Sequence, residues 1–296
     1  MSADKILSCP LCGGPSSEIG TKQGQWRKKD YTYRRCGDCS LVFVENPDRD
    51  FSEIYDDDYY AGKGADPVVD YCLEAKDPRR SIREYEWRGI VEIICALTDL
   101  NPKTRWLDFG CGNGDLVRHV REKVGCEIVG FEQGAIARSA VKKGIPVLRR
   151  EELARLGWQF DVVTALDVLE HVPHPVETLG EVFRLLKNPG VFFYTTGNAQ
   201  PFRKKILKWS YARPEIHISL YEPETMRRGL VQAGFDVSWP GYLRGYSSVY
   251  RHKILKNLSF RRRCMFSGLL PWRLVGRLVD WKLGLSRFPV GLKRHD

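Results

Sequence analysis

The chain has 296 residues, of which 43% are hydrophobic and 11% aromatic, and this suits one large packed domain with a small second one. It has no run of about 18 apolar residues and no basic N-terminal region followed by a long apolar core, so we expect neither a membrane span nor a signal peptide and predict a cytoplasmic protein. The net charge of +10 is concentrated near the C-terminus, because residues 241–296 hold thirteen Lys or Arg and two Asp, a local charge of +11.

Four of the nine cysteines form two close pairs in the N-terminal segment. Cys9 and Cys12 form the first pair, Cys36 and Cys39 form the second, and 23 residues separate the pairs. In a cytoplasmic chain this spacing favours a metal over disulfides, because two such turns bring four thiolates around one tetrahedral Zn²⁺ with no open position for catalysis. Four reduced thiols are the alternative. We therefore predict a small zinc ribbon over residues 1–45, in which zinc is structural.

Residues 46–80 form an acidic and aromatic segment that includes Tyr55, Tyr59 and Tyr60. Aromatic side chains beside carboxylates suit a lid over a ligand, whereas a linker docked on the surface of the main domain is the simpler interpretation. Apolar residues then recur near a 3.6-residue period from Ser81 to Leu97, which predicts a helix before the main sheet.

Strands and helices alternate over residues 81–240, the predicted main domain. The predicted strands are Arg105–Phe109, Glu127–Phe131, Val147–Leu148, Phe160–Ala165, Val191–Thr195 and Phe235–Trp239. The predicted helices are Asn113–Lys123, Gly134–Lys143, Pro175–Leu186 and Glu222–Ala233. This alternation predicts an α/β fold with a doubly wound, Rossmann-like, mostly parallel sheet, whose ligand lies at the carboxyl ends of the strands.

A glycine-rich loop follows the first of these strands. Gly110, Gly112 and Gly114 stand at alternate positions, so the backbone can turn sharply and approach a ligand closely. The spacing differs from the GxGxxG of dinucleotide sites, and a carboxylate at Asp108 would repel a pyrophosphate but suits an ammonium group. Glu132 ends the second strand, where a carboxylate can accept hydrogen bonds from both hydroxyls of a ribose.

Four segments, in this order, resemble class I S-adenosylmethionine-dependent methyltransferases: LDFGCGNG, GFEQG, FDVVTALDVLEHVPHP and LKNPGVFFYTTGN. The LEHVP stretch is most similar to the branch with ubiquinone-pathway O-methyltransferases and many small-molecule and sugar methyltransferases. The resemblance implies S-adenosylmethionine as cofactor. The residues it assigns to the cofactor are Asp108, Gly110 and Gly112 at the methionine part, Glu132 at the ribose, and Leu166 and Asp167 at the end of the fourth strand. Glu151 and Glu152 are weak matches to the adenine position.

Two histidines are candidates for the base that an acceptor hydroxyl needs. His171 directly follows Glu170 after the fourth strand, where a helix cap or a core position is the alternative role. His217 matches a family element whose histidine projects over the active site, although one residue here separates it from Glu215. We expect His217 to be the stronger candidate. The aromatic and basic insertion 198–214 predicts a lid over the acceptor, and its cations suit an anionic acceptor.

The combination of zinc ribbon and methyltransferase core resembles two groups. One is the sugar methyltransferases of deoxysugar and surface-polysaccharide pathways. Its C-methylating members carry a further C-terminal domain that this chain has no room for. We therefore expect O- or N-methylation of a small-molecule or glycan acceptor, such as a sugar, nucleotide sugar or lipid-linked saccharide. The other group is the large-subunit rRNA guanine methyltransferases, whose second knuckle pairs Cys with His. An enzyme that binds rRNA or tRNA through the ribbon and the basic tail is therefore the alternative.

Residues 241–296 are predicted to form a basic helical C-terminal extension. Leu274, Leu278, Trp281 and Leu285 share one helical face, and Arg273, Arg277 and Asp280 share another. Such a helix can lie on anionic lipid, bind RNA phosphates, or pack on the sheet with solvated cations. Packing on the sheet is the interpretation that we favour, and after it we expect peripheral contact with the inner face of the membrane before contact with nucleic acid. The seventh, antiparallel strand of this fold is not recognisable in the sequence, and the oligomeric state is not predicted.

Overall fold

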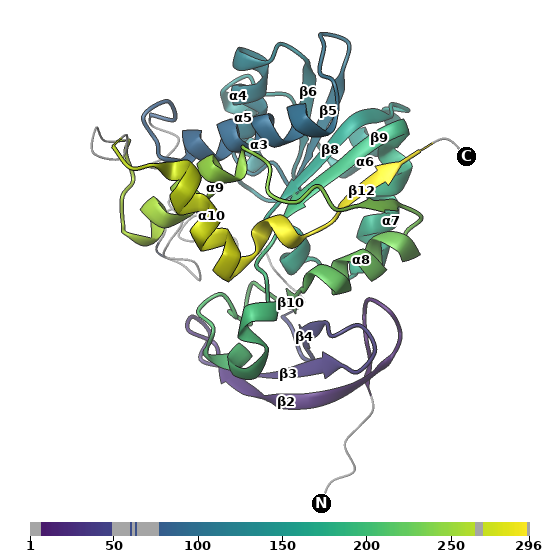
Figure 1. Ribbon diagram of the computed structural model, residues 1–296. Coiled ribbons are helices and arrows are strands. Elements are labelled where there is room, and N and C mark those ends of the chain that lie inside the picture. The colour runs from purple at the N-terminus through teal and green to yellow at the C-terminus, as the bar shows by residue number, and fades with distance from the viewer. Residues whose placement is uncertain (1–6, 49–59, 61–62, 64–76, 264–268, 295–296) are drawn as a thin grey trace, which may run out of the picture.

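A computed structural model describes residues 7–48, 60, 63, 77–263 and 269–294. Its centre is a seven-stranded sheet in the order β11-β12-β9-β8-β5-β6-β7, and a second, five-stranded sheet lies at the N-terminal end of the molecule (Figure 1). The predicted α/β fold with a doubly wound, mostly parallel sheet is confirmed. No helix of the described residues is long and apolar enough to cross a bilayer.

Most of the predicted strands lie within one residue of their predicted bounds, but the strand predicted at Val191–Thr195 begins five residues earlier, at Leu186. The parallel strands of the central sheet are β5 (Arg105–Phe109), β6 (Glu127–Phe131), β7 (Val147–Leu148), β8 (Phe160–Leu166) and β9 (Leu186–Thr195). Two antiparallel strands complete it, β11 (Asp236–Ser238) and β12 (Val290–Lys293). The strand order reverses between β5 and β8, which lie side by side, so their carboxyl ends mark the expected ligand crevice.

Helices cover both faces of this sheet. Those packed on one face are α3 (Arg83–Leu97), α4 (Asp115–Lys123) and α5 (Ala137–Lys142). Those packed on the other face are α6 (Arg150–Arg155), α7 (Pro175–Leu185) and α8 (Pro223–Gln232). Pro175 and Pro223 occupy the first turn of their helices, where the missing N–H removes no helical hydrogen bond.

The C-terminal residues belong to the main domain and do not form a separate extension beyond residue 240. They contain α9 (Tyr246–Asn257), α10 (Trp272–Leu283), the 3₁₀ turn η4 (Leu285–Arg287) and β12. Helix α9 lies so close to α3 that a Cβ on Gly89 would come within 2.6 Å of the Gly245 carbonyl oxygen. Strand β12 pairs with both β9 and β11, so the seventh strand that the sequence did not reveal lies here.

The N-terminal ribbon shares both a sheet and a core with the main domain. Its strands are β1 (Leu7–Ser8), β2 (Pro15–Gln23), β3 (Asp30–Cys36) and β4 (Val42–Val44). The fifth strand of this sheet, β10 (Ser219–Leu220), comes from the main domain and pairs with β4. Leu11 and Leu41 of the ribbon are buried in the same apolar cluster as Met226 of α8. The ribbon is therefore joined to the main domain by backbone pairing as well as by packing.

The predicted linker or lid at residues 46–80 falls largely outside the described residues, and this includes Tyr55 and Tyr59. Tyr60 is described, and its hydroxyl lies 2.8 Å from the position that a Cβ on Gly134 would take. This tyrosine therefore lies beside the end of the second parallel strand.

Candidate functional site

The glycine loop after β5 has the left-handed backbone conformation that its glycines allow. Gly110, Gly112 and Gly114 have φ angles of 78°, 55° and 75°, in the left-handed region that favours glycine. A Cβ on Gly110 would also lie 2.5 Å from a methyl carbon of Val168. The loop therefore brings bare backbone to the carboxyl ends of β5 and β8, directly before the N-terminus of α4.

Asp108, the last polar residue of β5, is buried, with 3% of its surface exposed. Its Oδ1 accepts a hydrogen bond of 2.9 Å from the Thr164 hydroxyl on β8, which in turn accepts one of 3.0 Å from the Trp106 indole N–H. Burial raises the pKa of Asp108 to about 7, and the neighbouring Glu132 carboxylate adds to the rise. A buried carboxylate with a raised pKa is stabilised in its ionised form by a cation.

Glu132 closes the loop from the next strand. Its two carboxylate oxygens accept hydrogen bonds from the backbone N–H groups of Gly112 at 3.0 Å and Gly134 at 2.7 Å. These bonds hold the carboxylate against the glycine loop, so the predicted cofactor residues of β5 and β6 form one continuous cradle. The weak adenine candidate Glu152 has another role, because it caps α6 through the Arg149 N–H at 2.7 Å.

Leu166 and Asp167 stand at the end of β8, as predicted, and both line a cavity. Asp167 has a left-handed φ of 52°, and its Oδ1 accepts a 2.8 Å hydrogen bond from the Thr195 hydroxyl. Its Oδ2 lies 3.4 Å from the ammonium of Lys253 on α9. Burial opposes ionisation, but Lys253 and Thr195 outweigh it and hold the pKa of Asp167 well below its usual range. Asp167 is therefore a fixed negative charge on the cavity wall.

The two predicted catalytic histidines meet on this cavity, although 45 residues separate them in the chain. Their ring centroids are 4.9 Å apart. His171 Nδ1 donates to the Ile216 carbonyl at 2.8 Å, and His217 Nδ1 donates to the Tyr211 carbonyl at 2.5 Å. A carbonyl oxygen only accepts, so each ring carries a proton on Nδ1, and the neutral form of each ring has its lone pair on Nε2. Both histidines therefore have the tautomer that a base requires.

Glu170 and Tyr211 complete this cluster, and the sequence did not predict that they would pair. The Tyr211 hydroxyl donates to Glu170, and the Gly197 N–H donates to the same hydroxyl at 3.1 Å. Glu170 is fully buried, and burial raises its pKa to about 8, with the Asp167 charge adding to the rise. Glu170, His171 and His217 each present a ligand atom within 4.8 Å of the others. Only the tertiary fold brings these residues together, because Tyr211 comes from the insertion 198–214 and lies 41 positions from Glu170 in the chain.

The cavity has a volume of about 330 Å³. It lies between the end of β8, the insertion 198–214, and helices α9 and α10. We call this insertion the lid. On the lid side, the rings of Phe202, Trp209, Tyr211 and His217 stack in sequence, with successive centroids 4.5, 4.9 and 4.1 Å apart. The segment forms the 3₁₀ turns η2 (Gln200–Lys208) followed by a loop. This stack forms an aromatic wall of the cavity.

The positive charge at the cavity does not come from the lysines of the lid. Arg203 pairs with Glu222, and Lys204, Lys205 and Lys208 are exposed and do not line the cavity. The cavity instead takes its cations from α3, α9 and the end of the lid, namely Arg83, Lys253, Lys256 and Arg213. The lining carboxylates are Glu86 and Asp167. The lining therefore carries more positive than negative charge.

Glu215 is not a partner of His217 but an anchor for the ribbon. It is 1% exposed, and its carboxylate accepts hydrogen bonds of 2.7–3.1 Å from the backbone N–H groups of Gln25, Trp26 and Arg27. These residues connect β2 and β3. The ribbon is thereby tied to the chain segment that positions His217.

The four ribbon cysteines lie together, as their spacing predicted. The Sγ atoms of Cys9 and Cys39 are 3.6 Å apart, those of Cys12 and Cys36 are 3.4 Å apart, and all four fall within 4.8 Å of one another. Sulfurs bound tetrahedrally to zinc at about 2.3 Å would be about 3.8 Å apart. The backbone N–H groups of Leu11 and Cys39 also point at cysteine sulfurs. The cluster has the size and donor set of a closed four-thiolate site.

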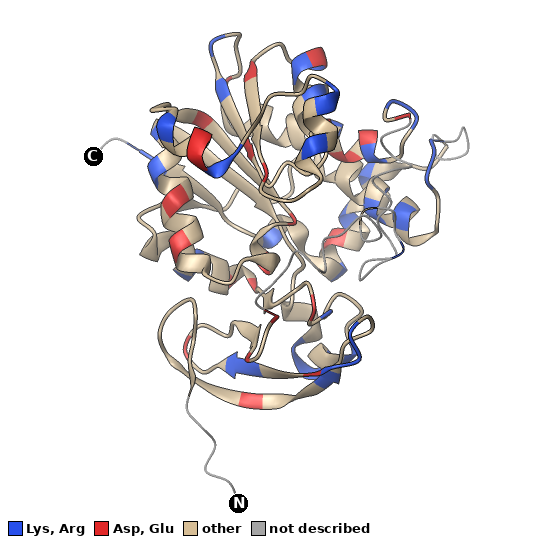
Figure 2. Cartoon of the chain, turned by 180° about the vertical axis from the view of Figure 1, so that it is seen from behind, with Lys and Arg blue, Asp and Glu red and all other residues tan. Residues whose placement is uncertain are grey.

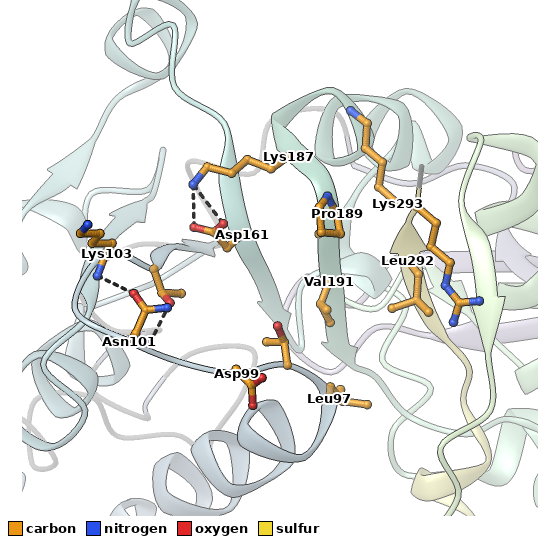
Figure 3. A pocket seen from close by; sticks show the side chains of 14 residues that line it. Leu97, Asp99, Asn101, Lys103, Asp161, Lys187, Pro189, Val191, Leu292 and Lys293 are labelled. Carbon is orange, nitrogen blue, oxygen red and sulfur yellow. Dashed lines mark hydrogen bonds and ion pairs between the residues drawn. The ribbon is translucent and has the colours of Figure 1, made fainter. Parts of the chain in front are cut away.

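A second hollow, of about 520 Å³, lies at the opposite ends of the strands (Figure 3). Its Lys187 forms an ion pair with Asp161 at 2.8 Å, and Lys293 donates to the carbonyls of Phe183 and Leu186. These cations already have protein partners, and the amino ends of parallel strands are not where such sheets bind ligands. The smaller cavity at the carboxyl ends is therefore the candidate site.

A family model described as a methyltransferase domain matches residues 79–238, more than half of the chain. The chain belongs to this methyltransferase family. The matched segment contains the glycine loop, Asp108, Glu132 and both histidines. The ribbon cysteines and helices α9 and α10 lie outside it.

Individual relatives match a shorter part of this methyltransferase-family chain. It is 33% identical over 128 residues to the ubiquinone biosynthesis O-methyltransferase of Pseudomonas fluorescens (strain SBW25) and 34% identical to that of Pseudomonas aeruginosa (strain LESB58). Both alignments cover 36% of this chain and 55% of the relative, so the chain spans about half the length of the curated relatives it matches.

Among solved structures, the plantazolicin methyltransferase BamL, in complex with a triazolic desmethylPZN analog and SAH, has a TM-score of 0.50 and 14% identity. That likeness covers 82% of this chain and 96% of the other, and at this identity it shows a shared fold alone.

Proposed function

We propose that this chain transfers a methyl group from S-adenosylmethionine to an oxygen or nitrogen atom of a small-molecule or glycan acceptor. The observation that carries the proposal is the position of the cavity. It lies at the end of β8, next to the strand whose Asp108 and glycine loop form the predicted cofactor cradle. Two histidines with the tautomer of a base line the same cavity.

The residues of the cradle fit this cofactor, which when bound supplies a methyl group on a positively charged sulfur. Asp108 offers a buried carboxylate that an ammonium would stabilise, and Glu132 offers carboxylate oxygens to ribose hydroxyls. The glycines allow the ligand to approach the backbone. Methyl transfer from a sulfonium depends mainly on alignment and on exclusion of water, and both suit a cradle built from buried groups.

His217 is the residue we assign as the base. Its Nδ1–H is held by the Tyr211 carbonyl, so Nε2 can accept the proton of an acceptor hydroxyl when the ring is neutral. His171 lies beside it and forms the second member of the pair. The excess of cations in the lining supports an anionic acceptor, such as a nucleotide sugar or a lipid-linked saccharide phosphate.

The zinc ribbon is assigned a structural role. A Zn²⁺ bound by Cys9, Cys12, Cys36 and Cys39 would have four thiolates and no open position. The hydroxyl of Thr225 on α8 donates to the Cys39 carbonyl at 2.6 Å, so the second knuckle is also fixed to the main domain. Metal analysis of the purified chain should give one zinc per chain, and Cys36→Ser should lower that ratio.

Calorimetric titration of the zinc-loaded full chain with S-adenosylmethionine tests the cofactor site. We expect micromolar binding, its loss in Asp108→Ala, and its retention in Asp161→Ala, a carboxylate at the opposite end of the sheet. No binding at millimolar cofactor would overturn the proposal.

Transfer of a labelled methyl group tests the acceptor class. Nucleotide sugars and lipid-linked saccharides are the expected acceptors. Transfer to ribosomal or transfer RNA, with none to these saccharides, would favour the RNA-directed alternative, which also predicts a steep dependence of RNA affinity on salt.

A further inference from the structure

The outward side of α10 is unusually apolar. Leu274, Leu278 and Trp281 lie on one face of the helix and are 58%, 62% and 79% exposed, and Leu270, two residues before the helix begins, is 52% exposed. We call these four side chains the outer face of α10. Among the described residues, seven of the eleven exposed large apolar side chains lie between residues 258 and 281. The exposed apolar surface is therefore concentrated on one part of the molecule.

The outer face is not needed to hold α10 in the fold. The opposite side of the helix supplies those contacts, because a Cβ on Gly276 would lie 2.4 Å from the Tyr242 hydroxyl, and Val279 and Leu283 pack on the main core. Asp280, expected on the solvated face, is 8% exposed and accepts hydrogen bonds from Tyr250 and Ser286. The helix thus has one apolar side that packs inward and another that has no partner among the described residues.

Within the described residues 269–294, exposed positive charge flanks the outer face and no exposed carboxylate accompanies it. Arg273 and Arg277 lie along one edge of the apolar stripe and Lys282 along the other, and all three are exposed. From residue 258 to residue 294 the sequence contains a single acidic residue, the buried Asp280. Lys and Arg predominate over Asp and Glu around the C-terminal helices (Figure 2).

We propose that the outer face of α10 docks on the surface of an anionic membrane. Leucine and tryptophan side chains would enter the boundary of the acyl chains while the flanking cations meet lipid phosphates, the combination that interfacial helices use. RNA phosphates would pair with the cations but leave the leucines exposed. A second copy of the chain would bring two basic rims together, and the described residues 269–294 offer no exposed carboxylate to pair with them.

The inner side of the same helix reaches the candidate active site. Val279 and Leu283 line the 330 Å³ cavity. Leu285, expected on the same helical face as Leu274, Leu278 and Trp281, instead lies in η4 and also lines this cavity. Docking would therefore place the cavity close to the lipid surface, and if the proposed methyl transfer holds, this location suits a lipid-linked anionic acceptor. The docking itself does not depend on that activity.

Vesicle flotation of the zinc-loaded full chain, without cofactor, tests the proposal. We expect binding to phosphatidylcholine vesicles that contain about one third phosphatidylglycerol, weaker binding at high salt, and little binding to phosphatidylcholine alone. Leu274→Ser with Leu278→Ser should lower the partition constant by about tenfold or more. The matched control is Val141→Ser with Val231→Ser, which removes two side chains that are 58% and 51% exposed on other helices and should change nothing.

Three results would overturn it. One is no flotation with the anionic vesicles, and another is flotation that the leucine variant leaves unchanged. The third is a dimer in sedimentation that dissociates in the leucine variant, because the outer face would then be a contact between copies. Calorimetry with S-adenosylmethionine, run on the same preparations, keeps a failure of docking separate from a failure of the proposed activity.

Discussion

Asp108 illustrates how a single residue acquires its chemistry from its place in the sheet. Alone, an aspartate ionises well below neutral pH. At the end of β5, under the glycine loop and beside Glu132, burial raises its pKa to about 7. A cation beside this carboxylate would stabilise its ionised form. The resemblance to methyltransferases leads us to expect the ammonium group of the cofactor at this place.

This pKa predicts a pH dependence of cofactor binding. Only ionised Asp108 pairs with an ammonium, and with a pKa of about 7 its ionised fraction rises from about one tenth at pH 6 to about three quarters at pH 7.5. The affinity for S-adenosylmethionine, measured by calorimetry, should increase about eightfold over this range. In Asp108→Asn the dependence should disappear, and a wild-type affinity that does not vary with pH would contradict the assignment.

The same shift has a consequence for the stability of the free protein. The folded state raises the pKa of Asp108 from 3.8 to about 7, so the folded chain binds more protons between these values. The free energy of unfolding should therefore fall as the pH rises from about 4 to about 7. Denaturant titrations of the wild type and Asp108→Asn should show that the variant lacks this part of the decline.

His217 can be separated from His171 by substitution. His217→Gln should lower turnover by about a hundredfold to ten-thousandfold, the usual contribution of a general base, with cofactor affinity unchanged. His171→Gln keeps the proposed base and should have the smaller effect. The check is single-turnover methyl transfer beside calorimetry. A larger loss of turnover in the His171 variant would reverse the two roles.

At the scale of elements, the ribbon and the segment 215–220 act as one structural unit. Strand β10 completes the ribbon sheet, Glu215 binds the turn between β2 and β3, and His217 follows two residues later. A small ribbon has little core of its own, so this attachment, together with the proposed zinc, would account for its order.

Removal of Glu215 tests this attachment. Glu215→Ala would leave three backbone N–H groups without their buried acceptor, and we expect the free energy of unfolding to fall by about 2 kcal/mol. Turnover should fall as well, because the position of His217 depends on this segment, while cofactor affinity is retained. Glu224→Ala, at an exposed carboxylate on α8, is the control and should change little. Equal stability of the two variants would contradict the anchoring role.

At the scale of the whole molecule, the last strand closes the sheet. Strand β12 lies between β9 and β11, so residues from the C-terminus hold together two strands that precede them in the chain. Helices α9 and α10 cover the cavity on the way to this strand. The basic C-terminal residues therefore form part of both the core and the site.

Truncation distinguishes this arrangement from a dispensable tail. Deletion of residues 289–296 removes β12 and should abolish cooperative unfolding or prevent soluble expression, because β9 and β11 lose their shared neighbour. Deletion of residues 295–296 alone leaves the strand intact and should have little effect. Circular dichroism on heating provides the comparison. A stable, cooperatively folded product of the longer deletion would show that the strand is dispensable.

The sequence by itself determined the parallel sheet, the glycine loop with Asp108 and Glu132, and the clustering of the four ribbon cysteines. These features depend on local patterns, since hydrophobic runs, alternate glycines and CxxC turns each act over a few residues. The tertiary structure decided which distant groups meet. It brought His171 to His217, joined Tyr211 to Glu170, assigned Glu215 to the ribbon and placed β12 within the sheet. Such contacts depend on how separate elements pack, and no short pattern in the chain records that packing.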